Sequence, residues 1–214
     1  MVLLDQNQVH ITHRPRLTLP LLLALAALAL GFAGLAARGF DAAGMRFGAQ
    51  LIWRFDAFVL FAALAARPAG QFIAPLRPLA DKGRPLLQGF AAVMGVFFAF
   101  LLVSGLSAMP DGVASWGVTA GMTAFILFTG AVTLVLWASL SRRFCEAVGV
   151  RACRAMTGMA VVYFWLCYVL LGVALSSGQG GPSLFHSASV IFLLAALIAR
   201  IAGRFFTVRN RTMA

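Results

Sequence analysis

Two ionisable side chains, Arg54 and Asp56, occur inside an otherwise apolar stretch of the chain. Charge within a membrane segment is costly, so such residues usually find partners or mark a path for ions or substrates. Residues two apart lie on different faces of a helix, so these two are not expected to pair with each other. Arg54 lies near the outer end of its predicted helix and can extend to the interface. Asp56, shorter and deeper, is open to two readings, a buried structural contact or a functional site.

His186 is the third candidate functional side chain. It is predicted at the outer end of the last apolar run, whereas His10 and His13 precede the first run. A lone interfacial histidine is more often solvated or hydrogen-bonded than a ligand. The three cysteines show no CxxC spacing and are expected to be free thiols. The sequence therefore predicts no catalytic residue, no metal ligand and no cofactor-binding residue.

An aromatic cluster, Tyr163, Trp165 and Tyr168, lies in the fifth apolar run. Such side chains could stack on a flat cofactor. Filling the core of a helix bundle is the favoured interpretation, because large aromatic side chains dominate the packing of protein interiors.

The composition is that of a membrane protein. Of the 214 residues, 62% are hydrophobic and 11% are charged, against about 45–50% and about 25% in average globular chains. Mean hydropathy is +0.94. The net charge of +11 is distributed over short loops rather than one extended face, so nucleic acid is not expected as a partner. The expected partner is the lipid bilayer.

Six apolar runs come close to the length of about 20 residues that crosses a hydrocarbon core. The predicted transmembrane helices cover residues 17–37, 50–66, 86–108, 115–139, 155–176 and 184–206. The first run is longer than the apolar region of a signal peptide and is kept as a helix. The predicted fold is all-α, a six-helix polytopic bundle over residues 17–206, flanked by a polar segment, 1–16, and a basic tail, 207–214. The proline-rich connector over residues 67–84 is expected near the membrane surface.

Basic residues predict the orientation of this bundle. Four segments are rich in basic residues: the one before the first helix, the loops that join the second helix to the third and the fourth to the fifth, and the tail from Arg200 onward. They carry two, four, four and four Lys or Arg residues. The alternate loops hold only Arg38 and Arg46. By the positive-inside rule both termini are expected in the cytoplasm.

Small residues are the expected contacts between helices, since lipid supplies no hydrophobic drive for helix association. Gly117 and Gly121 form a GxxxG pattern in the fourth predicted helix. Ala195, Ala199 and Gly203 repeat at four-residue spacing in the sixth. Packing within the bundle is favoured for both faces over a dedicated homodimer interface.

Three segments resemble the ferric reductase-like transmembrane family. They are WRFDAFVLFAALAARP (53–68), GRPLLQGFAAVMGVFFAF (83–100) and RACRAMTGMAVVYFWLCY (151–168). Each joins a basic residue to an apolar, aromatic-rich helix, and the resemblance extends over residues 53–173. It implies a bacterial inner-membrane protein related to subunits that carry electrons through b-type haem.

The same resemblance implies pairs of histidines that hold haem from two helices. In the matching segments, Val96 and Thr157 occupy the positions at which those histidines are expected. Residues 86–176 contain no histidine. No haem ligand is therefore carried over, and no cofactor is predicted.

These observations favour a haem-less relative that works by contact. The prediction is a non-catalytic accessory, assembly or structural subunit of a larger electron-transfer or photosynthetic membrane complex, with other membrane subunits as partners. One alternative is a redox protein with an atypical haem or quinone site. Another is a small transporter organised on Arg54 and Asp56.

Overall fold

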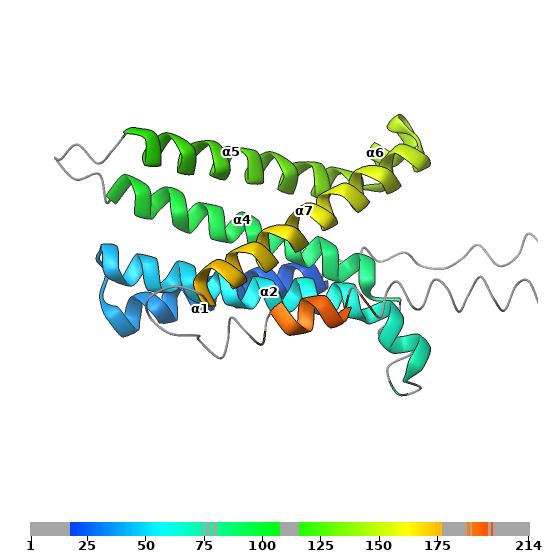
Figure 1. Ribbon diagram of the computed structural model, residues 1–214, viewed down its shortest axis with the longest axis horizontal. Helices are drawn as coiled ribbons and strands as arrows, with labels where there is room; N and C mark the ends of the chain where they lie inside the picture. The colour runs from blue at the N-terminus through cyan, green and yellow to red at the C-terminus, as the bar shows by residue number, and fades with distance from the viewer. Residues whose placement is uncertain are drawn as a thin grey trace, which may run out of the picture.

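The computed structural model is helical in the part of the chain that it describes, namely residues 18–73, 75, 78, 81–107, 116–176, 188, 190–196 and 198 (Figure 1). Its labelled helices are α1 (Thr18–Arg38), α2 (Ala42–Phe72), α4 (Gly83–Ser107), α5 (Trp116–Ser139), α6 (Arg142–Val148) and α7 (Val150–Ser176). Residues 190–196 form a further helical segment. The first four of the labelled helices run roughly along the long axis, and α7 crosses them obliquely (Figure 1).

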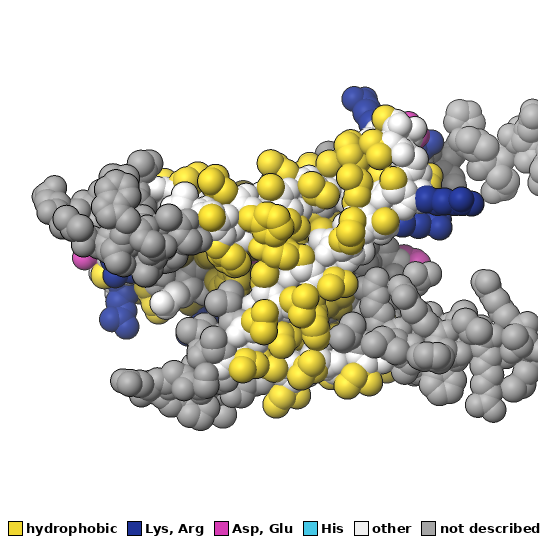
Figure 2. Space-filling view, turned by 45° about the horizontal axis from the view of Figure 1, so that its top comes forward, with side chains coloured by type: hydrophobic (Ala, Val, Ile, Leu, Met, Phe, Trp, Pro, Cys, Tyr) yellow, Lys and Arg dark blue, Asp and Glu magenta, His cyan; other side chains and the backbone are white. Residues whose placement is uncertain are grey.

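Helix length and hydropathy make this chain a polytopic integral membrane protein. Four described helices are long and apolar enough to cross a membrane, in α1, α2, α4 and α7. A fifth span is formed if α5 and α6, which meet at a 90° bend, count as one broken element. Hydrophobic side chains cover the middle of the molecule, and Lys and Arg side chains gather toward its ends (Figure 2). The predicted polar segment, basic tail and most of the sixth predicted helix lie outside the described residues.

Several helices begin or end at residues other than those predicted from the sequence. The second predicted helix, 50–66, is α2, which starts at Ala42 and continues through Pro68 to Phe72. Proline is tolerated there because membrane helices can satisfy the backbone groups that it frees. The predicted loop after residue 139 contains α6, and α7 begins at Val150 rather than residue 155. Gly149, with φ of +98°, allows the chain to turn between these two helices.

A tight turn joins α1 to α2. Gly39 has φ of +102°, a conformation that glycine adopts without strain. Its N–H donates to the Leu35 carbonyl at 2.8 Å, which ends α1. Asp41 then caps α2, because its carboxylate accepts a hydrogen bond from the Gly44 N–H at 2.8 Å. The two helices are thereby set side by side from this turn.

Glycines bring α1 and α2 into close backbone contact. A Cβ atom built on Gly34 would lie 2.5 Å from the Gly48 Cα atom, and one built on Gly48 would lie 2.7 Å from the Gly31 carbonyl oxygen. Neither glycine can gain a side chain unless the helices move apart. This is the small-residue packing that membrane helices use in place of the hydrophobic effect.

Polar contacts attach α5 to its neighbours. The backbone carbonyl of Leu140, just after α5, accepts hydrogen bonds from Arg84 at 2.7 Å and Gln88 at 3.3 Å, both on α4. The hydroxyl oxygens of Ser139 and Thr157 lie 2.8 Å apart and link α5 to α7. Along α5 the buried side chains from residue 123 onward form one narrow stripe, Thr129, Thr133, Leu136 and Ser139. The rest of that stretch is half-buried or exposed.

The helical segment 190–196 packs on α2 and α7. The Trp165 indole N–H donates to the Leu193 carbonyl at 3.0 Å, and the rings of Phe61 and Phe192 have centroids 5.4 Å apart. Leu193 and Ala196, three residues apart, share the buried face, whereas Ala195 is exposed. Of the other residues predicted to pack, Ala199 and Gly203 lie outside the described part. Gly117 and Gly121 lie in α5, but the contacts around these two glycines fall outside the described part of the structure.

Candidate functional site

Asp56 is the most unusual side chain in the bundle. It lies in the middle of α2 and has no exposed surface. The Tyr168 hydroxyl, on α7, donates a hydrogen bond to its Oδ2 atom at 2.7 Å. Tyr168 is itself buried. A polar contact between two helices in an apolar interior holds both elements in register, since neither group has water as an alternative partner.

Aromatic rings enclose this pair. Trp53, one turn before Asp56 on α2, stacks on Tyr168 with centroids 4.2 Å apart and planes at 23°. Phe90 of α4 meets the same tyrosine edge-on at 6.4 Å, and Phe97 of α4 lies 5.4 Å from Trp53. Phe164 closes the cluster against Phe90 at 4.9 Å. Side chains of α2, α4 and α7 thus fill the space around the carboxyl group.

The second carboxyl oxygen of Asp56 is different. Its Oδ1 atom is buried and makes no hydrogen bond within the described part of the chain. A buried polar atom without a partner costs about 1–3 kcal/mol relative to a satisfied one. Such atoms are rare in native structures, and each calls for an explanation. Both readings of Asp56 from the sequence, a buried structural contact and a functional site, are compatible with this geometry.

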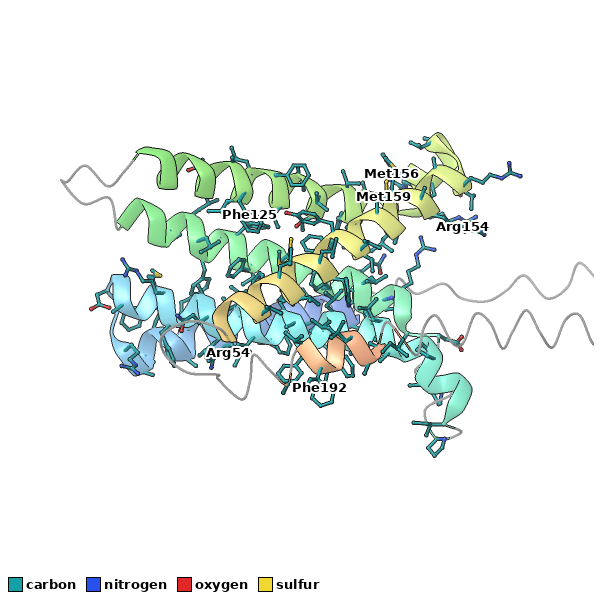
Figure 3. The ribbon with its side chains drawn as sticks, viewed as in Figure 1. Arg54, Phe125, Arg154, Met156, Met159 and Phe192 are labelled. Carbon is teal, nitrogen blue, oxygen red and sulfur yellow. The ribbon has the colours of Figure 1, made fainter. Side chains whose placement is uncertain are left out.

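Arg54 is the second charged candidate of α2. It is half-buried and takes part in interactions of its own. Figure 3 shows it toward the end of the molecule opposite Arg154, which belongs to the first turns of α7. Arg54 and Asp56 are not brought together in an ion pair, in line with their spacing. His186, the third sequence candidate, lies outside the described residues.

The chain matches no protein family, no curated protein and no solved structure. What it does must therefore be argued from its own residues.

The residues at the expected haem positions do not fit that cofactor. The Thr157 hydroxyl donates to the Cys153 carbonyl at 2.9 Å, within its own helix, and contacts Ser139 of α5. Val96 packs against the apolar cluster that α1, α2 and α4 share. Neither side chain has a nitrogen or sulfur atom that could ligate haem iron. Within the described ranges, no three His, Cys, Asp or Glu side chains come close enough to hold a metal ion.

The remaining aromatic candidates serve as contacts between helices. Tyr163 bonds through its hydroxyl to that of Thr129 on α5, at 2.7 Å, and Thr129 also donates to the Phe125 carbonyl. Trp165 contacts the segment 190–196, as described above. Each of these polar atoms meets a partner on a neighbouring element.

Sequence reasoning singled out Asp56 but missed its partner. The chain has two tyrosines, Tyr163 and Tyr168, and both lie in one predicted helix. A buried carboxyl group needs a donor from another helix, and a tyrosine is among the few donors that the apolar runs offer. That signal was present in the sequence. The stacking of Trp53 on Tyr168 depends on how the helices cross and has no counterpart in residue spacing.

Proposed function

We propose that the chain is a non-catalytic subunit of a larger membrane complex, which it serves by contact as an accessory, assembly or structural component. The observation that carries this proposal is the filled interior. The rings of Trp53, Phe90, Phe164 and Tyr168 occupy the space between α2, α4 and α7, with centroid distances of 4.2 to 6.4 Å. A flat cofactor at this point would have to displace them.

The resemblance to the ferric reductase-like transmembrane fold adds support. In that reading the scaffold is retained, and hydroxyl and apolar side chains, Thr157 and Val96, replace the haem histidines. A chain that keeps an electron-transfer scaffold without its ligands is suited to a place beside electron-carrying subunits. The resemblance also implies a bacterial inner membrane, and the distribution of Lys and Arg predicts that both termini lie in the cytoplasm.

The outer surface of α5 gives further support. Large apolar side chains on it are exposed, and they are Phe125, Leu127, Phe128, Leu134 and Trp137. Lipid covers such a face in an isolated membrane protein, and a helix of another subunit could cover the same face in a complex. The narrow buried stripe of α5 leaves this surface open.

The test is purification of an affinity-tagged chain from its own membranes in a mild detergent, followed by measurement of particle mass. We expect a particle larger than one 22.8 kDa chain with its detergent, with a second protein at fixed stoichiometry. The same preparation in a harsh detergent, and membranes that contain an untagged chain, serve as controls. A stable lone monomer in the mild detergent would contradict the proposal.

Asp56 favours a second candidate, a small transporter organised on Arg54 and Asp56. The supporting observation is the buried Oδ1 atom, because an intramembrane carboxyl group can relay protons or ions. Proteoliposomes that contain a pH-sensitive dye test this directly. If the candidate is right, the wild type conducts protons above the protein-free background and Asp56→Asn, nearly the same in shape, does not. Background flux in the wild type removes this candidate.

A further inference from the structure

Two adjoining depressions lie at the end of the bundle where α1 turns into α2. The first, of about 270 Å³, is lined by Arg38, Ala43, Arg46, Phe47 and Gln50. The second, of about 280 Å³, shares Arg46 and Gln50 with it and continues over Ala49, Trp53, Phe97 and Leu101. Together they form one groove, here called the arginine groove, which is basic at one end and apolar at the other.

The two arginines at its basic end are not neutralised within the described part of the chain. The described ion pair lies elsewhere, between Arg142 and Glu146. Asp41, the nearest acidic residue in sequence, uses its carboxylate to cap α2. The Arg38 guanidinium is held over the Phe47 ring, 5.2 Å from its centroid. A positive, partly ordered site of this kind suits an anion, and guanidinium groups bind phosphate with matched geometry.

The depth of the groove in the membrane identifies the occupant. Arg38 is the last residue of the first candidate span, and Arg46 is in the first turn of the second, Ala43–Ala66. Both therefore lie at headgroup level. Trp53 is seven residues further along α2, or about 10 Å deeper at 1.5 Å per residue. Phe97 and Leu101 lie in the last turns of the span Gly83–Val103. The apolar end of the groove is thus at the depth of acyl chains.

The geometry points to a binding site for an anionic phospholipid, with its phosphate between Arg38 and Arg46 and one acyl chain along Trp53, Phe97 and Leu101. Gln50, which borders both depressions, can donate its amide to the phosphate or ester oxygens. The apolar end also borders the candidate site, because Trp53 lines the groove and stacks on Tyr168. A bound chain would therefore press on the ring that covers the Asp56–Tyr168 pair.

Native mass spectrometry of the detergent-purified protein tests this site. The protein is mixed with equimolar phosphatidylglycerol and phosphatidylcholine of identical acyl chains. We expect the anionic lipid to be retained about thirtyfold better, since each of the two basic side chains near the headgroups adds about 1 kcal/mol and about 1.4 kcal/mol is tenfold. Arg38→Gln/Arg46→Gln should remove that preference. Both side chains are exposed, so the fold should survive, and thermal unfolding of the variant checks this.

The matched control is Arg151→Gln/Arg154→Gln, a pair of exposed arginines at the start of α7, which should keep the preference. Short-chain phosphatidylglycerol should bind more weakly than the long-chain lipid, and millimolar inorganic phosphate should displace little of it, because the acyl chain contributes. Equal retention of the two lipids by the wild type would overturn the proposal. It would also be overturned by an equal loss in the control pair, or by full displacement by phosphate alone.

Discussion

A single hydrogen bond, from Tyr168 to Asp56, places a carboxyl group in the middle of an apolar bundle. Two free energies describe its effect on stability, namely what the bond contributes and what the loss of one partner costs. Interhelical hydrogen bonds in membranes contribute on average about 0.6 kcal/mol. Removal of one partner of a buried pair costs more, about 1–3 kcal/mol, because the other partner is left unsatisfied. Because the second free energy is larger, removal of the tyrosine hydroxyl should lower the stability of the protein by more than the bond itself contributes.

Tyr168→Phe should therefore lower the free energy of unfolding by about 1–2 kcal/mol, since both Asp56 oxygens would then be unsatisfied in the described interior. Thermal unfolding in detergent, followed by intrinsic tryptophan fluorescence, measures the change. The matched control is Tyr163→Phe, whose partner Thr129 keeps its bond to the Phe125 carbonyl. Its effect should be smaller.

The double variant Asp56→Val/Tyr168→Phe distinguishes structure from function at this site. If the pair is structural, replacement of both polar groups should restore stability to near the wild-type value, because no buried polar group is left unpaired. It should also leave complex formation intact. A double variant that is well folded but fails to assemble, or that loses a transport activity, would instead make Asp56 functional.

At the scale of helices, glycine contacts hold α1 against α2. Gly34→Ala or Gly48→Ala should destabilise the protein by about 1–3 kcal/mol, since the added methyl group meets backbone atoms that cannot rotate away. Gly95→Ala on α4 is the control, because its Cβ would meet nothing within 4 Å, and it should be neutral or slightly stabilising. Unfolding temperatures in detergent report both effects. Equal losses at Gly95 and Gly48 would contradict this packing.

The helices could be predicted from the sequence with more success than their contacts. Apolar runs of membrane length predicted α1, α4, α5 and α7 to within a few residues, since hydropathy is a local property. The start of α2 was missed because Arg38, Asp41 and Arg46 suggested a loop. The same region contains Gly44 and Gly48 at GxxxG spacing, a signal for the α1–α2 contact that was passed over in favour of Gly117 and Gly121.

The candidate site could be predicted only in part. A lone Asp56 in an apolar run is visible in the sequence, and so is the absence of histidine at residues 96 and 157. The partner Tyr168, 112 residues away, depends on the oblique path of α7 across the bundle. The spacing of residues along one helix does not predict the angle at which that helix crosses its neighbours. The burial of Trp53 against Tyr168 follows from it as well.

At the scale of the whole molecule, charge predicts orientation. Among the described residues, the end that joins α5 to α7 and precedes α4 carries Lys82, Arg84, Arg142, Arg143, Arg151 and Arg154. The opposite end, at the α1–α2 turn, carries Arg38 and Arg46. By the positive-inside rule, we expect the first end to face the cytoplasm.

Thiol labelling tests this orientation. In a cysteine-free background, Phe40→Cys at the α1–α2 turn should react with a membrane-impermeant maleimide on intact cells. Val148→Cys at the end of α6 should react only after permeabilisation. Both native side chains are exposed, at 79% and 45%, so reagent access does not limit either site. The reverse pattern of labelling would invert the orientation and place the arginine groove in the cytoplasmic leaflet.

The most direct test of a filled, contact-making bundle is the visible absorption spectrum of the detergent-purified protein, oxidised and dithionite-reduced, with a haem assay on the same sample. We predict a colourless protein with haem far below one per chain, because aromatic side chains occupy the interior and Val96 and Thr157 cannot ligate iron. A Soret band that shifts on reduction, at nearly one haem per chain, would contradict this and show the protein to be a redox carrier with an atypical ligand set.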